Sequence, residues 1–206
     1  MKKKILVAGG TGYIGSHTTV ELQNAGYDVV IIDDLSNSNI EVLDGIEKIT
    51  GIRPTFIQLD LKDKEGTRKA LEANPGIEGV ILFAASKAVG ESVQQPLKYY
   101  RNNITTLVNI LELMPEFNMK GIVFSSSCTV YGQPDPENLP VTEEAPIKPA
   151  MSPYGNTKQI NEEIIRDTIH ANAPFKSIIL RYFNPIGAHP SAEIGELPNG
   201  VPQNLI

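Results

Sequence analysis

Short apolar runs alternate with amphipathic stretches along most of the chain. Six runs have the length and the β-prone residues of buried strands: residues 4–8, 28–33, 55–59, 79–83, 121–125 and 177–182. Four stretches between them have helical spacing: residues 16–25, 64–73, 96–116 and 156–172. Because strands that alternate with helices form parallel sheets, the pattern predicts an α/β fold with helices on both faces of the sheet.

The first strand runs into a glycine-rich turn, Gly9-x-x-Gly12-x-x-Gly15. A helix-compatible stretch follows and ends at Gly26, a predicted C-terminal cap, before the second strand at 28–33. This βαβ unit is typical of a Rossmann-like doubly wound parallel sheet. Glycines at that turn let the backbone approach a pyrophosphate, and the helix N-terminus supplies N–H groups and a positive dipole end.

Asp33 ends the second strand, where an acidic side chain reaches the adenosine ribose of a dinucleotide. The next basic residue along the chain is Lys48. Since a carboxylate repels a 2′-phosphate and no cation lies near it in the sequence, the pattern favours NAD over NADP.

Two segments break the alternation. Residues 132–153 hold six prolines, which predicts an irregular loop of the length that is usually functional. From Asn184 onward the chain is rich in glycine and proline and lacks periodicity. We therefore expect a NAD-binding domain over residues 1–183, and over residues 184–206 the start of a substrate-binding region, with most of the C-terminal substrate domain missing and with few means of ordering itself.

Composition narrows the possible functions. The 206 residues carry a formal net charge of −6 and no basic cluster beyond the three lysines at 2–4, which argues against nucleic acid as a partner. No apolar stretch approaches the ~20 residues that span a bilayer, and no signal-peptide core follows the lysines. Cys128 is the single cysteine, and three scattered histidines give no metal-ligand spacing. We expect a cytoplasmic protein without a metal.

Candidate chemistry lies near the predicted ends of the later strands. Tyr154 and Lys158 stand four residues apart where a helix is predicted to begin, so they share one helix face. An ammonium near a phenol favours the phenolate and lowers the tyrosine pKa toward the range of a general base. Ser127, in the polar run after the fifth strand, is placed to orient a substrate hydroxyl beside Tyr154.

In this order, the glycine turn, Ser127 and Tyr154-x-x-x-Lys158 resemble the extended short-chain dehydrogenase/reductase family, and within it the isomerases that interconvert UDP-glucose and UDP-galactose. The similarity covers essentially the whole chain. Its most specific blocks are residues 9–17, 87–92, 125–132, 152–158 and 180–190.

The resemblance implies a set of binding residues. Those around NAD would be Gly9, Gly12, Tyr13, Ile14, Gly15, Asp33, Asp34, Asn37, Ser38, Asp60, Leu61, Phe83, Ala84, Lys87, Asn102, Tyr154, Lys158 and Tyr182. Those that meet the UDP-sugar would be Ser127, Tyr154, Asn184, Asn204 and Leu205. In the implied mechanism the tyrosine takes the proton of the sugar 4-hydroxyl while hydride passes from C4 to NAD, and hydride then returns to the other face of the 4-keto sugar.

The resemblance also implies a homodimer in which two helices of each chain form a four-helix bundle. Apolar residues of the stretches at 96–116 and 156–172 exceed what one sheet-facing stripe requires: Leu107, Ile110, Leu111, Ile160, Ile164 and Ile165. Packing on the sheet alone is the other interpretation of these residues.

Members of the family are larger, so the chain is expected to match their N-terminal portion and to hold only the rim of a sugar-nucleotide site. A sugar-nucleotide 4,6-dehydratase is disfavoured, because the two acidic residues that follow its catalytic hydroxyl residue are Cys128 and Thr129 here. A 4-epimerase or decarboxylase acting on another UDP-sugar, and an inactive NAD-binding fragment, stay open as alternatives.

Overall fold

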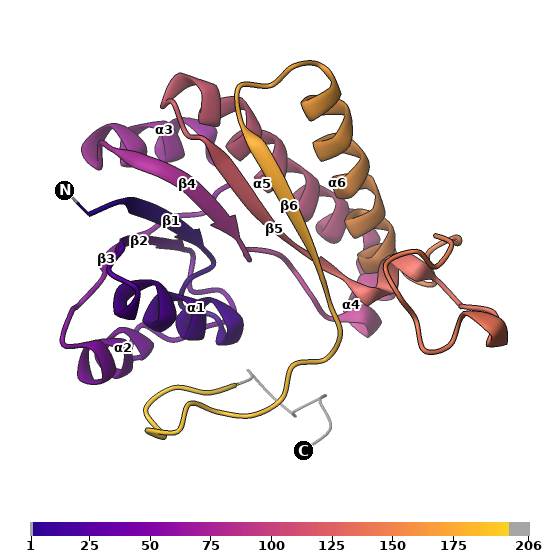
Figure 1. Cartoon of the computed structure of the whole chain (residues 1–206), viewed down its shortest axis with the longest axis horizontal. Coiled ribbons are helices and arrows are strands. Elements are labelled where there is room, and N and C mark those ends of the chain that lie inside the picture. Colours follow the sequence, from indigo (N-terminus) through magenta and orange to yellow (C-terminus); the bar gives the residue numbers. More distant parts are fainter. Residues whose placement is uncertain (1, 198–206) are drawn as a thin grey trace.

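A six-stranded parallel sheet with helices on its faces is the framework of this chain (Figure 1). The computed structural model describes residues 2–197. The strands are β1 Lys4–Ala8, β2 Asp28–Asp33, β3 Thr55–Gln58, β4 Ile77–Leu82, β5 Gly121–Ser127 and β6 Lys176–Tyr182. The helices are α1 Tyr13–Asn24, α2 Val42–Thr50, α3 Lys64–Ala73, α4 Val89–Gln94, α5 Pro96–Glu116 and α6 Pro153–His170, with the 3-10 turns η1 Cys128–Tyr131 and η2 Pro136–Asn138.

The strand order is β3-β2-β1-β4-β5-β6, and every adjacent pair is parallel. All six predicted strands are confirmed, each within two residues of its predicted ends, and so is the Rossmann-like doubly wound arrangement. Residues 132–152 are irregular apart from the three of η2, as predicted, and Pro153 begins α6.

Two helices, α2 and α4, are absent from the prediction. α4 has only six residues, too few to show a period. α2 does carry Leu43 and Ile46 at helical spacing, but Gly45 at its centre is a poor helix former. The structure explains that glycine, because a Cβ on Gly45 would lie 2.6 Å from the backbone oxygen of Glu193, where the segment after β6 crosses the helix.

Alternate residues of the strands face two hydrophobic layers. Val7, Val29 and Ile31 pack toward α1 and α2, whereas Leu6, Val30 and Ile32 pack toward α3, α5 and α6; Figure 1 shows the two groups of helices on opposite sides of the sheet. Because successive side chains point to opposite faces and both faces are buried, these strands are nearly continuous apolar runs in the sequence.

Helices lie on both faces of the sheet, as predicted, and β6 is partly uncovered on one of them. On the face that carries α1 and α2, Ile178 and Leu180 of β6 are 59% and 39% exposed. They follow the strand period of two: Lys176 is exposed as well, whereas Ser177 and Ile179 between them are less exposed. None of the helices within residues 2–197 is long and apolar enough to cross a membrane.

The segment from residue 184 to 197 returns from β6 to α1 and α2 (Figure 1). Its Ile194 is 4% exposed and packs among Val20, Leu43 and Ile46. Two ion pairs hold it as well, Lys48 to Glu193 at 2.9 Å and Lys87 to Glu196 at 3.2 Å. The expectation that this segment has few means of ordering itself is therefore wrong up to residue 197. The buried side chain of Ile194 holds the segment against α1 and α2, although the segment is rich in glycine and proline.

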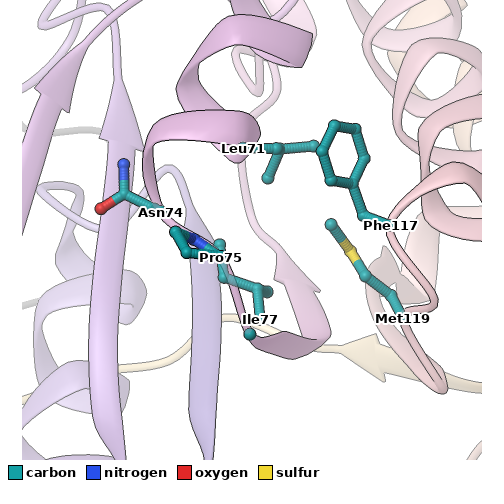
Figure 2. Close-up of a pocket in the computed structure, with 7 residues that line it drawn as sticks. Leu71, Asn74, Pro75, Ile77, Phe117 and Met119 are labelled. Atoms are coloured by element: carbon teal, nitrogen blue, oxygen red, sulfur yellow. The ribbon is translucent and has the colours of Figure 1, made fainter.

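A small cavity of about 20 Å³ lies at the amino end of β4. Figure 2 shows the Leu71 side chain pointing toward the Phe117 ring, with Ile77 and Met119 below them. The lining is mostly apolar and lies at the end of the sheet opposite the glycine turn. Functional chemistry is therefore to be sought at the other edge of the sheet.

Candidate functional site

The predicted site residues follow the carboxyl ends of the strands. The strand order reverses between β1 and β4, the position at which doubly wound sheets leave a crevice for a ligand. Because all strands are parallel, their carboxyl ends meet at one edge, and the turns after β1, β2, β3 and β4 gather there with the ends of β5 and β6.

Two glycines of the turn after β1 are required by packing. Gly9 has a φ of +81°, and a Cβ on it would lie 2.6 Å from the Ala84 nitrogen; a Cβ on Gly15 would lie 2.2 Å from the Gly9 oxygen. Phe83 and Ala84 donate their N–H groups to the Ala8 oxygen at 2.8 and 2.9 Å. These contacts press the turn against the end of β4.

Gly12 differs from Gly9 and Gly15, because packing within the chain does not require it. A Cβ there would meet no atom closer than 3.4 Å, and its φ of −72° suits any residue. It is the N-cap of α1 without a side-chain cap, so the first N–H groups of the helix, at Tyr13 and Ile14, lack intrahelical acceptors. A missing Cβ beside such donors leaves room for an anion, and these residues fit the pyrophosphate of a dinucleotide.

Asp33 is fixed beside this turn. Its carboxylate accepts hydrogen bonds from the Thr11 N–H at 3.2 Å, from the Leu35 N–H at 3.0 Å and from the Ser38 hydroxyl at 3.1 Å. Ser38 and Thr11 also share a hydrogen bond of 2.7 Å. The carboxylate thus lies rigidly at the end of β2 beside the crevice. The neighbouring Asp34 and Asn37 are exposed, and Asp34 accepts from Ser36.

A second polar group joins the ends of β3 and β4 to α5. Lys62 pairs with Asp60 at 3.0 Å and donates to the Asn102 side chain at 2.9 Å, and Asn102 donates to Ser86 at 3.1 Å. Leu61 is 4% exposed. The structure therefore brings Asp60, Leu61, Phe83, Ala84 and Asn102 to one edge with the glycine turn.

Ser127, Tyr154 and Lys158 meet where α6 packs on the end of β5. Ser152 caps α6 by accepting from the Gly155 N–H at 3.1 Å, and Pro153 occupies the first turn. A Cβ on Gly155 would lie 3.3 Å from Thr129, so this glycine allows the helix start to approach η1. The local sequence therefore places Tyr154 within reach of Ser127.

The hydrogen bonds of Ser127 define which way its proton points. Its oxygen accepts from the Thr129 N–H at 3.2 Å and lies 2.9 Å from the Thr129 hydroxyl, which donates to it. The Ser127 proton is then left to donate to Tyr154, and this hydrogen bond favours the phenolate.

The predicted lowering of the Tyr154 pKa is wrong. Burial raises the pKa of Tyr154 above its ordinary value, and Ser127 opposes this only in part. Lys158 is 3% exposed, donates to the Ser125 oxygen at 2.7 Å and lies 5.8 Å from the centre of the Tyr154 ring. Burial lowers the pKa of Lys158 to about 8. Desolvation is therefore the largest influence on the pKa of both groups.

Several buried polar side chains around this cluster are absent from the prediction. The Asn103 side chain donates to the Ser86 backbone carbonyl at 3.1 Å and to the Thr157 hydroxyl at 3.0 Å. The Asn161 side chain donates to the Asn103 backbone carbonyl at 3.1 Å. The Thr157 hydroxyl donates to the backbone carbonyl oxygen of Tyr154 at 2.7 Å. Their signal in the sequence is a set of polar residues on the apolar stripes of α5 and α6.

Tyr99 is also absent from the prediction. It is fully buried, its ring packs edge-on to that of Tyr154 at 6.5 Å, and its hydroxyl donates to Glu91 at 2.7 Å. Burial and Glu91 together raise the pKa of Tyr99. A neutral phenol therefore supports one side of the Tyr154 ring.

The remaining predicted residues lie at or beyond the end of β6. Tyr182 pairs in register with Ser127 and is half-buried. Asn184 is exposed and lies two residues past the end of the strand. Asn204 and Leu205 lie outside the described residues. Lys87 is near the crevice, although its ammonium pairs with Glu196.

Comparisons with known proteins show what this chain is similar to. The chain is 53% identical over 202 residues to UDP-glucose 4-epimerase of Bacillus subtilis (strain 168), covering 98% of this chain and 58% of that protein. It is 49% identical over 209 residues to UDP-glucose 4-epimerase 2 of Arabidopsis thaliana, covering 100% of this chain and 59% of that protein. The chain thus spans less than two thirds of the length of these relatives.

A solved structure gives the same result. The crystal structure of UDP-glucose 4-epimerase from Bifidobacterium longum in complex with NAD+ and UDP matches with a TM-score of 0.93 and 44% identity, over 98% of this chain and 59% of that one. Residues 5–206 match the profile of the NAD dependent epimerase/dehydratase family. On this match and this geometry, the chain belongs to the NAD dependent epimerase/dehydratase family.

Proposed function

We propose that this chain holds NAD along the carboxyl edge of the sheet. The Gly9–Gly15 turn and the first N–H groups of α1 take the pyrophosphate, and Asp33 takes the adenosine ribose. The other proposed contacts come from the adjoining turns and strand ends: Asp34, Asn37, Ser38, Asp60, Leu61, Phe83, Ala84, Lys87, Asn102, Tyr154, Lys158 and Tyr182. The room at Gly12 and the anchored carboxylate of Asp33 support this placement.

The proposed reaction is the interconversion of UDP-glucose and UDP-galactose. When bound, NAD supplies the acceptor and donor of hydride for C4 of the sugar. Tyr154 takes the proton of the 4-hydroxyl at its phenolic oxygen and later gives it back. Ser127 donates to that oxygen, and Lys158 adds positive charge from a position fixed by the Ser125 carbonyl. Asn184, Asn204 and Leu205 are proposed contacts of the nucleotide-sugar.

The observation that carries this proposal is the meeting of Ser127, Tyr154 and Lys158 at the edge that also holds the glycine turn. Elimination, as in a dehydratase, needs an acid and a base after Ser127. Cys128 and Thr129 occupy those positions, and the Thr129 hydroxyl is engaged with Ser127.

The assembly and the division of the chain are also proposals. Residues 1–183 form the NAD-binding domain, and residues 184–206 begin the substrate-binding region. The homodimer would use the outer faces of α5 and α6, and its place would be the cytoplasm, where a lone Cys128 stays reduced. Fractionation of the cells that make the protein tests the location, and recovery with the membranes or outside the cell would contradict it.

The test of the reaction is turnover of UDP-galactose in the presence of NAD, followed by NMR of the sugar. Tyr154→Phe should lower the rate roughly 10²–10⁴-fold, because it removes the proton-transfer group. Tyr27→Phe, after α1 and distant from the cluster, is the control. The proposal fails if the protein does not bind NAD, or if Tyr154→Phe turns over as fast as the unmodified chain.

A further inference from the structure

Three consecutive serines of β5 each contact a different turn of α6. The Ser127 hydroxyl serves Tyr154, the Ser125 carbonyl accepts from Lys158, and the Ser126 hydroxyl donates to Glu162 at 2.6 Å. Residues 154, 158 and 162 are one helical turn apart and share a face. The proposed function uses the first two contacts and leaves the third, to Glu162, without a role.

Glu162 is the most heavily bonded carboxylate of this region. Its side chain is 1% exposed and accepts two hydrogen bonds from Arg181 of β6, at 3.0 and 2.8 Å, and one from Arg166 at 2.6 Å. Arg181 also donates to the Tyr131 hydroxyl of η1 at 3.0 Å. One carboxylate therefore joins β5, β6 and α6, and through Arg181 it reaches η1.

We propose that Glu162 is a positioning residue, which fixes the third turn of α6 to β5 and β6 and thereby holds Tyr154 and Lys158 against Ser127 and Ser125. This proposal rests on the proposed function in one respect, the roles of Tyr154 and Lys158 in the reaction. The contacts themselves are geometric. The Glu162 side chain is itself buried, and charge-assisted bonds to a carboxylate are short and directional, which suits a group that sets the register of a helix.

The same carboxylate acts on Lys158 through its charge. Glu162 raises the pKa of Lys158, whereas burial lowers it. The groups that face this ammonium are Glu162 and Tyr154 from α6, and the Ser125 carbonyl and the Phe124 ring from β5. Without the carboxylate, less of the ammonium would stay charged near neutral pH.

The experiment compares Glu162→Gln with Glu163→Gln, which makes the same change of charge on the exposed neighbouring residue. The titration of Lys158 and the phenol signal of Tyr154 are followed by NMR with labelled lysine and tyrosine, and Lys158→Met and Tyr154→Phe assign the two signals. We expect E162Q to move the Lys158 midpoint to lower pH and to shift the Tyr154 signal, and E163Q to change neither. A folded E162Q with both signals at their original positions overturns the proposal.

E162Q also leaves the Arg181 guanidinium without its carboxylate, so a second variant covers the case in which E162Q does not fold. Ser126→Ala then decides, because it removes the tether to β5 and leaves both ion pairs in place. In Ser126→Ala we expect the Tyr154 signal to shift less than in E162Q. A spectrum of Ser126→Ala identical to that of the unmodified protein overturns the proposal. Neither measurement uses NAD or a UDP-sugar, so an inactive chain would refute the proposed function without touching this result.

Discussion

At the scale of single residues, the buried ammonium of Lys158 opposes folding near neutral pH. Its pKa falls from 10.5 to about 8 on burial, so between these values the unfolded chain binds more protons at this position than the folded one. By linkage, the contribution of Lys158 to the free energy of unfolding increases as pH rises through this window. The cost of keeping the charge is therefore largest below about pH 8.

Lys158→Met should accordingly stabilise the protein at pH 7 by about 1–2 kcal/mol, the cost of the buried charge less the hydrogen bond lost at Ser125. This advantage should shrink as pH rises toward 10. Urea unfolding at both pH values measures it, and Lys69→Met, exposed on α3, is the control for the loss of one positive charge. A variant that is less stable than the unmodified protein at pH 7 would show that the ammonium is well solvated.

Asp33 gives the second prediction at this scale. We expect NAD to bind much more tightly than NADP, because a 2′-phosphate would meet a carboxylate that three donors hold in place. Asp33→Asn should reduce the ratio of the NADP and NAD dissociation constants at least about tenfold. Calorimetry with both cofactors measures it, and Asp28→Asn at the start of β2 is the matched loss of charge. Equal affinities of the unmodified chain for the two cofactors would sink this account.

At the scale of elements, the glycines of the turn after β1 have different roles: Gly15 is required for packing, whereas Gly12 leaves room for a ligand. Gly12→Ala should fold normally, since its Cβ finds room, but should bind NAD at least about tenfold more weakly because that room is meant for phosphate. Gly15→Ala places its Cβ 2.2 Å from a backbone oxygen and should lose at least about 1–3 kcal/mol of stability. Thermal unfolding and calorimetry distinguish the two variants. Full NAD affinity in Gly12→Ala would remove the turn from the proposed site.

The segment at 184–197 is a second element, and Ile194 is the buried hydrophobic residue that packs it against α2. Ile194→Ala should lower the free energy of unfolding by about 2–4 kcal/mol, as a buried isoleucine in the layer with Leu43 and Ile46. Ile186→Ala, 75% exposed in the same segment, should change it by less than about 0.5 kcal/mol. If urea unfolding gives equal values for the two variants, the segment does not pack on α2 in solution.

These elements also show how far the sequence predicts the structure. Runs such as 28–33 and 121–125 identify their strands because a strand buried on both faces is apolar throughout. Ile194 could not be identified, because a lone isoleucine among glycines and prolines has no period, and its burial depends on α2 more than 140 residues earlier. The raised pKa of Tyr154 could not be foreseen either, because it depends on burial by residues from other elements.

At the scale of the whole molecule, the open question is which surface meets a second copy. The sequence suggested a dimer because α5 and α6 carry six apolar residues, more than one sheet-facing stripe requires. Four of the six are buried in the core of this chain: Leu107 at 0%, Ile110 at 1%, Leu111 at 6% and Ile165 at 0% exposure. That part of the argument for a dimer is wrong. Ile160 and Ile164 stay half-buried on α6, as do Ile104 and Val108 on α5, at helical spacing along both helices.

We therefore expect the dimer to form through these half-buried positions, with α5 and α6 of each copy in a four-helix bundle. Sedimentation velocity over a range of concentrations should show a dimer, and Ile160→Glu should shift it to monomer because the carboxylate would be buried without a partner. Ile52→Glu makes the same change at a 41% exposed isoleucine just past α2 and should leave the dimer intact. A monomer at every concentration would mean that these isoleucines serve only the fold of one chain. A dimer unaffected by Ile160→Glu would place the interface on another surface.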